Sequence, residues 1–321
     1  MISVVVPAFN AAETIDSCLV ALAKQTVPGD RYEVIVVDDG SIDGTAARAE
    51  QRGVRVLRQT NQGPAAARNH GAREARGELL LFTDADCVPA ATWIEEMAKP
   101  FANPKVAGVK GIYRTRQPEL AARFIQVEYE QKYERMRRRS EIDFVDTYSA
   151  AFRRDLFLSY KGFDTSFPSA SVEDQEFSFR LAENGHKMVF QPTAIVFHRH
   201  QPNFAGYLRR KFYVAYWKVR VLMKHPKKVG GDAHTPESLR LQIVFTYAFI
   251  GALLAALLFP RALVLAGLSL AAFLASTLPF VSFARGRDPS VARLAPGILF
   301  LRSIAFCAGL VAGAFGRITR R

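Results

Sequence analysis

Cysteine is scarce in this chain of 321 residues, which has only Cys18, Cys87 and Cys307, far apart and without CxxC spacing. This scarcity argues against a disulfide framework and against a structural zinc site. The N-terminus also lacks a charged stretch followed by an apolar one, so we predict no secretory signal peptide. The first half of the chain is therefore expected to stay in the cytosol.

One long stretch of the chain is almost without charge, and another is without negative charge. Arg261 is the sole charged residue between positions 241 and 284, and residues 184–231 contain ten Lys or Arg but no Asp or Glu. The net charge of +13 is thus concentrated beside an apolar region. Such an arrangement is attracted to an anionic membrane face, and it also marks the cytoplasmic side of a span. Both interpretations place this part of the chain at a membrane, and neither requires nucleic acid as a partner.

The apolar back of the chain contains three hydrophobic segments, residues 241–259, 262–283 and 298–315. The first two are long enough to cross a bilayer. The third contains Arg302 and is followed by a basic tail, which a third crossing would place outside, against the positive-inside rule. The sequence favours two spans over three, with the third segment re-entrant or interfacial. Residues 203–224 form an amphipathic pattern that predicts a helix in the headgroup plane or an ordinary packed surface helix.

The front of the chain alternates between two periodicities. Short β-branched runs at residues 2–6, 32–37, 54–57 and 78–82 predict strands, and residues 11–25, 45–52 and 64–76 predict helices. This alternation favours an α/β fold with a mostly parallel, Rossmann-like sheet and helices on both faces. Further helices are predicted at 119–139 and 172–184, and strands at 188–190 and 194–197. We predict a catalytic domain at 1–202, an interfacial helix and linker at 203–238, and a membrane domain at 239–321.

Polar residues follow four predicted strands, at positions 7–10, 38–43, 61–68 and 84–86. Ligands of open parallel sheets bind beyond the carboxyl ends of the strands, so these segments predict one shared site. Asp84 and Asp86 flank a single residue, and alternation along an extended chain puts both carboxylates on one side. Two such oxygen donors suit a hard divalent cation that bridges a diphosphate. Asp38 and Asp39 fit either turn chemistry or a carboxylate that accepts from a nucleoside, and the two are compatible.

Two further groups have both a structural and a chemical interpretation. Glu173 and Asp174 begin a predicted helix, where acids complement the helix dipole, but a carboxylate there also suits a general base. His198 follows a short predicted strand. It is either a structural histidine or a group that completes the metal site or touches the diphosphate.

These residues lie within a pattern that resembles glycosyltransferase family 2, whose catalytic domain has the GT-A fold. The resemblance covers about residues 2–200 and runs in the order of the family. It is carried by VVVPAFN at 4–10, VDDGSIDGT at 37–45, NQGPAAARNHG at 61–71, TDADC at 83–87, AFRRDLF at 151–157, KGFD at 161–164, EDQEFSFRL at 173–181 and VFH at 196–198.

The resemblance implies an inverting transfer from a nucleotide-sugar, with UDP as the expected nucleotide. It implies Asp174 as the base, with Glu173 beside it to order the acceptor. It assigns Asp84, Asp86 and His198 to a Mg²⁺ or Mn²⁺ ion. It assigns the nucleotide-sugar to a larger set: Pro7, Asn10, Asp38, Asp39, Gly63, Arg68 and Asp84. Arg153 and Arg154 resemble basic residues of the family near the acceptor pocket.

Two departures from the family pattern bear on the acceptor. Residues 146–150 read DTYSA where many relatives have a smaller stretch with Asn, and no QxxRW motif follows the Glu-Asp pair, which argues against a processive polymerase. The leading hypothesis is a membrane-anchored enzyme that adds one sugar to a lipid-linked acceptor of the polyprenyl diphosphate type, as in bacterial surface polysaccharide assembly. The alternatives are a polyprenyl-phosphate glycosyltransferase and a non-catalytic membrane scaffold that binds nucleotide-sugar. A nucleotidyltransferase is disfavoured because no Gly-rich basic loop follows the first strand.

Overall fold

The computed structural model describes residues 1–167, 172–232 and 235–316. Their contacts divide the chain into two compact units. The first, here called the sheet unit, comprises residues 1–116 and 135–199, and the second, the helical unit, comprises residues 117–134 and those from 200 onward. The three domains predicted from the sequence follow expected function, whereas these two units follow contacts. The predicted domains therefore stay a prediction.

The sheet unit is built on one 8-stranded sheet in the order β3-β2-β1-β4-β7-β6-β8-β5. The strands are β1 Ile2–Ala8, β2 Tyr32–Asp38, β3 Arg55–Arg58, β4 Leu79–Phe82, β5 Cys87–Pro89, β6 Val106–Arg114, β7 Ala150–Arg153 and β8 Lys187–His198. The first four strands in spatial order are parallel, because their interiors are apolar on both faces and helices connect them. The α/β fold predicted for this part is confirmed.

The other half of the sheet is mixed and was largely missed by the sequence patterns. Strand β7 is antiparallel to both β4 and β6, whereas β6 and β8 are parallel. The three-residue β5 pairs antiparallel with the end of β8. The two short strands expected at 188–190 and 194–197 form a single strand, β8, because its pairing with β6 continues across register shifts.

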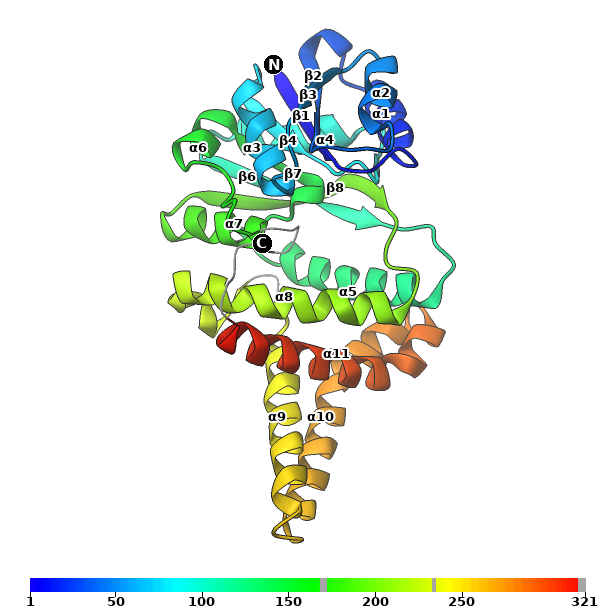
Figure 1. The fold of residues 1–321 in the computed structure, drawn as a ribbon, viewed down its shortest axis with the longest axis vertical. Coiled ribbons are helices and arrows are strands. Elements are labelled where there is room, and N and C mark those ends of the chain that lie inside the picture. The colour runs from blue at the N-terminus through cyan, green and yellow to red at the C-terminus, as the bar shows by residue number, and fades with distance from the viewer. Residues whose placement is uncertain (168–171, 233–234, 317–321) are drawn as a thin grey trace. The chain divides into compact units, whose positions relative to one another are not determined.

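Helices cover both faces of this sheet (Figure 1). They are α1 Ile15–Ala23, α2 Thr45–Gln51, α3 Pro64–Glu74, α4 Trp93–Ala98, α6 Arg154–Ser159 and α7 Glu173–Glu183. Helix α3 approaches β1 and β2 closely at Gly71, where a Cβ would lie 2.4 Å from the side chain of Val5. Any larger residue there would push α3, and with it Arg68, away from the sheet.

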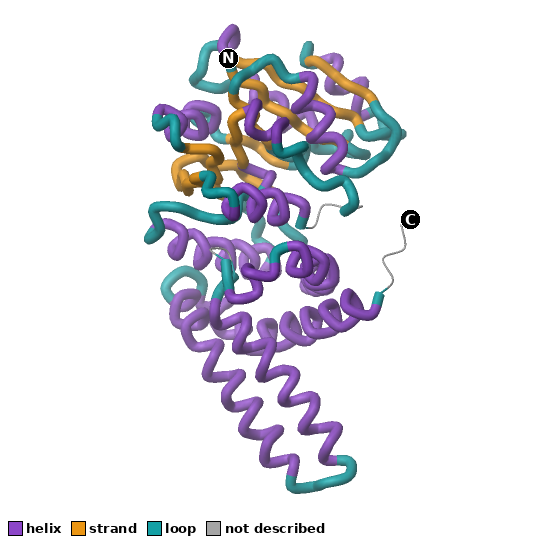
Figure 2. The backbone as a smooth tube through the Cα atoms, turned by 90° about the vertical axis from the view of Figure 1, so that its left-hand side faces the viewer, coloured by secondary structure: helices purple, strands orange, loops and turns teal. Residues whose placement is uncertain are grey.

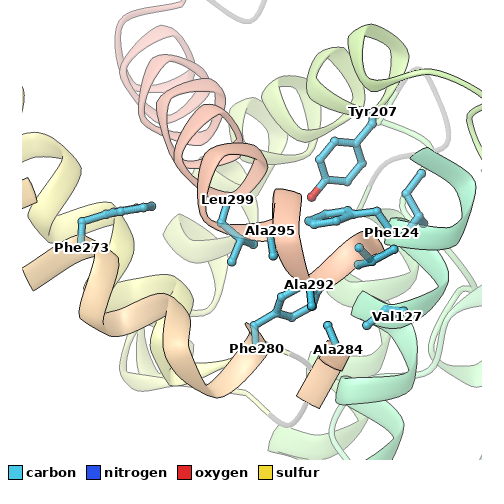
Figure 3. Packing of buried hydrophobic residues seen from close by; sticks show 11 residues of the cluster. Phe124, Val127, Tyr207, Phe273, Phe280, Ala284, Ala292, Ala295 and Leu299 are labelled. Atoms are coloured by element: carbon cyan, nitrogen blue, oxygen red, sulfur yellow. The ribbon is translucent and has the colours of Figure 1, made fainter. Parts of the chain in front are cut away.

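The helical unit contains most of α5 Leu120–Arg137, then α8 Phe204–Lys224, α9 Glu237–Ala256, α10 Ala262–Arg285 and α11 Pro289–Phe315. One apolar cluster joins α5, α8, α10 and α11, as Figure 3 shows around Phe124, Tyr207, Phe280 and Leu299. The edge-to-face contact of Phe124 with Tyr207 has ring centroids 5.6 Å apart, within the favourable range for aromatic pairs. This cluster fixes the crossing of α11 over its neighbours.

Three helices in the described part of the chain are long and apolar enough to cross a membrane: α9, α10 and α11. Helices α9 and α10 pack side by side as a hairpin, whereas α11 runs crosswise to them and alongside α8, as both views show (Figures 1 and 2). The third apolar segment begins at Pro289 instead of residue 298. Its start is set by Asp288, whose carboxylate accepts hydrogen bonds from the backbone N–H groups of Ser290 and Val291.

Candidate active site

The loops after β1 and β2 are tied to each other by side chains from the predicted site. The Asn10 side-chain oxygen accepts from the backbone N–H of Ile42 at 3.0 Å, and the Asn10 N–H donates to the Ser41 hydroxyl at 2.9 Å. Asn10 has a positive φ of 48°, which asparagine tolerates better than most residues. Pro7 is buried in β1 beside Val37. The predicted meeting of these two strand ends is therefore present in the structure.

Asp39 holds the next loop, which leads into α3. One of its carboxylate oxygens accepts from the Gly63 N–H at 2.8 Å, and the other accepts from the Gln62 N–H at 2.9 Å and the Gln59 amide at 2.7 Å. Gly63 caps α3 with a positive φ of 88°. The neighbouring Asp38 is buried, and its Oδ1 has no hydrogen-bond partner among the described residues. A buried acceptor without a partner is unfavourable unless a ligand or water donates to it.

Asp84 and Asp86 lie just beyond β4, and they form a cluster that fits a divalent cation. One carboxylate oxygen from each and the Cys87 sulfur lie within 4.8 Å of one another. Burial raises the pKa of the Cys87 thiol well above its usual value, with Asp84 and Asp86 adding to the effect, so the thiol stays protonated. The two carboxylates are thus the available anionic donors of this cluster, and oxygen donors are what Mg²⁺ and Mn²⁺ prefer.

His198 reaches Asp86 through the antiparallel pairing of β5 with β8, which sets Cys87 opposite His198. His198 Nε2 lies 3.3 Å from Asp86 Oδ2. Burial on its own raises the pKa of Asp86, but the hydrogen bond and charge of His198 outweigh it and hold the pKa below its ordinary value. The structure therefore brings together all three residues that the sequence assigned to the metal.

A stack of aromatic rings next to this cluster was missed by the sequence analysis. The Tyr113 ring stacks on the His198 ring at 4.5 Å, and its other neighbour is the stacked ring of Tyr148 at 3.3 Å. The buried Lys110 donates to the Tyr148 hydroxyl at 3.1 Å and pairs with Asp146. Burial lowers the pKa of Lys110 to about 7, opposed by the charge of Asp174. Residues 146–150, where the sequence departs from the family pattern, thus provide part of the structure between His198 and Asp174.

Arg68 connects the acidic pair to the start of α7. Its guanidinium donates to Asp84 Oδ1 at 2.6 Å and to Glu173 Oε1 at 3.1 Å. The side chains of Arg68 and Glu173 are both only 3% exposed. A buried bidentate arginine of this kind fixes both of its partners. Arg68 and Glu173 therefore lie in the predicted site, but as buried supports of its two acidic groups.

Asp174 is half-buried at the first turn of α7. Its carboxylate accepts from the Gln175 N–H at 2.7 Å and from the Thr147 N–H at 3.4 Å. Burial and, after it, the charge of Glu173 raise the pKa of Asp174, Arg68 opposes both, and the net pKa is about 7. A carboxyl with this pKa exchanges protons near neutral pH, as a general base requires.

The structure does not bring Arg153 and Arg154 to these residues. Strand β7 runs antiparallel to β4, so Arg153 pairs with Leu79 at the start of β4, the end opposite Asp84. Arg153 donates to backbone carbonyls of Phe101, Asn103 and Val106, and Arg154 donates to those of Ala72 and Arg73. These contacts support a role in holding loops and helix ends together.

Replacing Arg68 by methionine is expected to lower the free energy of unfolding by about 3–5 kcal/mol, because it removes the buried cation that pairs with the carboxylates of Glu173 and Asp84. Urea unfolding of the purified protein, followed by circular dichroism, measures the change. Arg48→Met is the matched control, since Arg48 pairs with Asp16 at the surface and the loss of such a pair costs about 0–1 kcal/mol. Equal effects of the two substitutions would contradict a supporting role for Arg68.

The fold, with an acidic pair beyond β4 and a carboxylate at the start of α7, defines a glycosyltransferase of the GT-A class. The sequence model described as "Glycosyl transferase family 2" matches residues 3–160. Glycosyltransferase AglE of Haloferax volcanii is 30% identical over 231 residues, which cover 69% of this chain and 74% of that protein. The chain belongs to glycosyltransferase family 2.

Two further comparisons bear on the extent of the likeness. The pre-mycofactocin glycosyltransferase of Mycobacterium tuberculosis is 26% identical, over 71% of this chain and 49% of that protein, so the match spans about half of its length. The solved structure of the mannosyltransferase PcManGT from Pyrobaculum calidifontis, in complex with GDP-Man and Mn²⁺, has a TM-score of 0.63 and 21% identity. It covers 98% of this chain and 87% of that chain, so the likeness in fold extends beyond the sheet unit.

Proposed function

We propose that this chain is an inverting, metal-dependent glycosyltransferase that moves one sugar from a nucleotide-sugar to a lipid-linked acceptor at the cytoplasmic face of a membrane. The observation that carries the proposal is the buried Arg68, which pairs with Asp84 of the acidic pair and with Glu173, the neighbour in the chain of Asp174, whose pKa lies near neutrality. Donor activation and acceptor deprotonation are the two tasks of such a transfer, and we propose the acidic pair for the first and Asp174 for the second.

The nucleotide is assigned to the loops beyond β1, β2 and β3. Asp38 offers a buried acceptor to a donor N–H or hydroxyl of the nucleoside. Asn10, Asp39 and Gly63 hold these loops in place, since their polar groups bind the loops to one another. UDP is the proposed nucleotide. GDP is the alternative, favoured by the mannosyltransferase with GDP-Man that shares the fold.

The residues present fit a bound Mg²⁺ or Mn²⁺, because two carboxylate donors and an imidazole converge at the end of β4. When bound, such an ion would neutralise negative charge on the departing nucleoside diphosphate. Asp84 and Asp86 would hold it, and His198 would orient Asp86. Mn²⁺ is present in solved relatives of the same fold.

Asp174 is proposed as the general base. The acceptor hydroxyl oxygen forms a bond to the anomeric carbon while the bond from that carbon to the diphosphate breaks. The hydroxyl proton passes to the Asp174 carboxylate, and the electron pair of the broken bond leaves with the diphosphate. Attack on the side opposite the leaving group inverts the anomeric configuration. Glu173 lies next to this base in the chain, and its buried carboxylate balances the positive charge of Arg68.

The lipid-linked acceptor is proposed from the apolar helices and the basic chain that precedes them. Helices α9 and α10 qualify as spans by length and composition. Residues 184–231 carry ten cations and no acid, which suits the phosphate groups of a polyprenyl diphosphate and an anionic leaflet. A polyprenyl phosphate as direct acceptor is the second candidate, favoured by the same charge.

A donor panel tests the proposal. Purified protein in lipid vesicles would meet UDP-, GDP- and dTDP-sugars with Mn²⁺ or Mg²⁺, with and without an extract of membrane lipids. We expect nucleotide release from one donor class that requires the metal and increases with the lipid extract. Product analysis by mass spectrometry then distinguishes a sugar on a polyprenyl phosphate from one on a longer lipid-linked glycan. Nucleotide release that depends on neither the metal nor the lipid extract would contradict the proposal.

A further inference from the structure

Helix α11 is long and apolar enough to cross a membrane, yet it has a polar side within the protein. Arg302, at its middle, is buried and donates to Glu128 Oε1 of α5 at 2.5 Å and to the side chain of Gln242 in α9. Lys211 of α8 lies 3.1 Å from the other oxygen of Glu128. Burial raises the pKa of Glu128, but Lys211 and Arg302 lower it to about 2, so Glu128 is ionised.

The start of α11 is held by a second polar contact to α5. Arg123 donates through two nitrogens to both carboxylate oxygens of Asp288, at 2.7 and 2.8 Å. Arg287 extends this contact, with Nε 3.3 Å from Glu130 Oε2. Helix α11 is thus attached to α5, a helix rich in charged side chains, at its first residue and again at its middle.

Two glycines allow the second half of α11 to pack closely against α8. A Cβ on Gly309 would lie 2.3 Å from the carbonyl oxygen of Phe212, and one on Gly313 would lie 2.4 Å from that of Tyr216. Both spacings are four residues, so the two helices run alongside each other in the same direction with their backbones in contact. Small residues at this spacing allow such an approach.

Helix α8 has a composition that keeps it out of hydrocarbon. It carries six cations and no acid, namely Arg209, Arg210, Lys211, Lys218, Arg220 and Lys224. A Lys or Arg at the centre of a bilayer is strongly unfavourable. Because α11 runs beside α8 in backbone contact, a crossing by α11 would take α8 with it.

The outer face of α11 is apolar from Leu294 onward, whereas Arg293, near its start, is exposed on the same side. Its exposed large side chains are Leu294, Leu301, Ile304, Val311 and Phe315. They share one side of the helix, whereas Arg302, Phe306 and Gly309 face the protein. The α9–α10 hairpin, which also exposes apolar side chains, projects away from the side of α11 on which α8 lies (Figures 1 and 2).

We propose that α11 lies in the plane of the membrane surface, with Leu294, Leu301, Ile304, Val311 and Phe315 in the acyl boundary, and that the chain crosses the bilayer only with α9 and α10 among the described residues. The partner of this surface is the lipid bilayer, because α9 and α10, which pack against α11, also expose large apolar side chains and qualify as spans. The proposal rests on the membrane location given under the proposed function. It places Gly286 and Gly316, at either end of α11, on the side of the membrane where α9 begins.

Depth measurement by electron paramagnetic resonance tests this arrangement. Single nitroxide labels at Leu294, Leu301 and Val311, in full-length protein with the three native cysteines replaced by alanine, would be measured in vesicles of phosphatidylethanolamine and phosphatidylglycerol. Accessibility to oxygen and to a nickel chelate gives the depth of each label. We expect three similar, shallow depths. A spanning α11 would instead spread them over about 25 Å, at 1.5 Å per residue.

Labels at Leu253 and Leu274 serve as references, because both side chains are exposed and lie toward the middle of the two apolar spans. They are expected to lie deeper than every label on α11. Water-exposed labels on both α11 and the hairpin would refute the membrane location itself. Lipid-exposed hairpin labels with a depth gradient along α11, or with α11 in water, would overturn only the present proposal.

A pair of glycine substitutions tests the lock between α8 and α11. Gly313→Leu is expected to lower the thermal midpoint by several degrees and to spread the depths of the three α11 labels, because its side chain meets the Tyr216 backbone. Gly297→Leu is the matched control, since a Cβ there meets nothing within 4 Å. Equal behaviour of the two variants would contradict the docking of α11 on α8.

Discussion

Asp86→Ala is expected to reduce metal-dependent transfer by about 10³-fold or more. The carboxylate supplies one of the two anionic oxygen donors at the end of β4, and a divalent cation contributes several kcal/mol to the stabilisation of charge in the transition state. Each 1.36 kcal/mol corresponds to a factor of ten in rate. Steady-state kinetics with a saturating donor, over a range of Mn²⁺ concentrations, measures the loss.

A second measurement separates this effect from unfolding. Binding of Mn²⁺ to the protein without nucleotide, followed by the resonance of the free ion, is expected to weaken strongly in Asp86→Ala. Asp30→Ala is the control, because Asp30 is an exposed aspartate in a short turn and belongs to neither metal nor nucleotide loop. If Asp86→Ala binds Mn²⁺ as wild type does, the assignment of the metal to this pair is wrong.

Asp174→Asn is the second substitution with a large expected effect, a fall in transfer of about 10²–10⁴-fold, the range that a general base contributes. Asparagine preserves the shape of the side chain, and its single carbonyl oxygen can keep the short hydrogen bond from the Gln175 N–H, at the loss of the longer one from Thr147, but it cannot take up a proton. Donor binding, measured by calorimetry with the nucleoside diphosphate, is expected to change little. Glu183→Gln, exposed at the far end of the same helix, is the control.

The pH dependence of kcat/KM tests the role of Asp174 as general base in a second way. Because burial raises the pKa of Asp174 to about 7, the carboxyl is protonated below that pH and cannot act as a base. We expect kcat/KM to fall on the acid side, with an inflection at or below pH 7, since a bound cation nearby favours the ionised form. The residual activity of Asp174→Asn is expected to lack this acid limb. An unchanged limb would identify a different base.

Much of the site was predictable because the carboxyl ends of parallel strands meet at one edge. The loops around Asn10, Asp39 and Asp84 could be assigned from apolar runs followed by polar turns, and the structure brings them together. The role of Arg68 was only partly predictable. Its motif indicated donor binding, but the ion pair with Glu173 joins residues far apart in the chain, and local periodicity contains no signal for such a contact.

The rest depended on pairing between distant strands. A three-residue strand such as β5 has too few positions to show alternation, so neither its pairing with β8 nor the stacking of Tyr113 on His198 could be foreseen. The acceptor assignment of Arg153 and Arg154 rested on the motif alone, without the antiparallel direction of β7. For α11, Arg302 already weighed against a third crossing, but its contact with Glu128 of α5 joins residues far apart in the chain and could not be foreseen.

The position of β8 in the sheet has a consequence for biosynthesis. It is the last strand among the described residues, and it fills the place between β6 and β5. Until the ribosome has made residues 187–198, the edge of β6 is open and Asp86 has no histidine beside it. At roughly 5–20 residues per second, the first apolar helix is finished only some 3–12 s after β8. The sheet unit therefore has time to close before the α9–α10 hairpin is complete, so in the proposed membrane location it would be closed before the chain enters the bilayer.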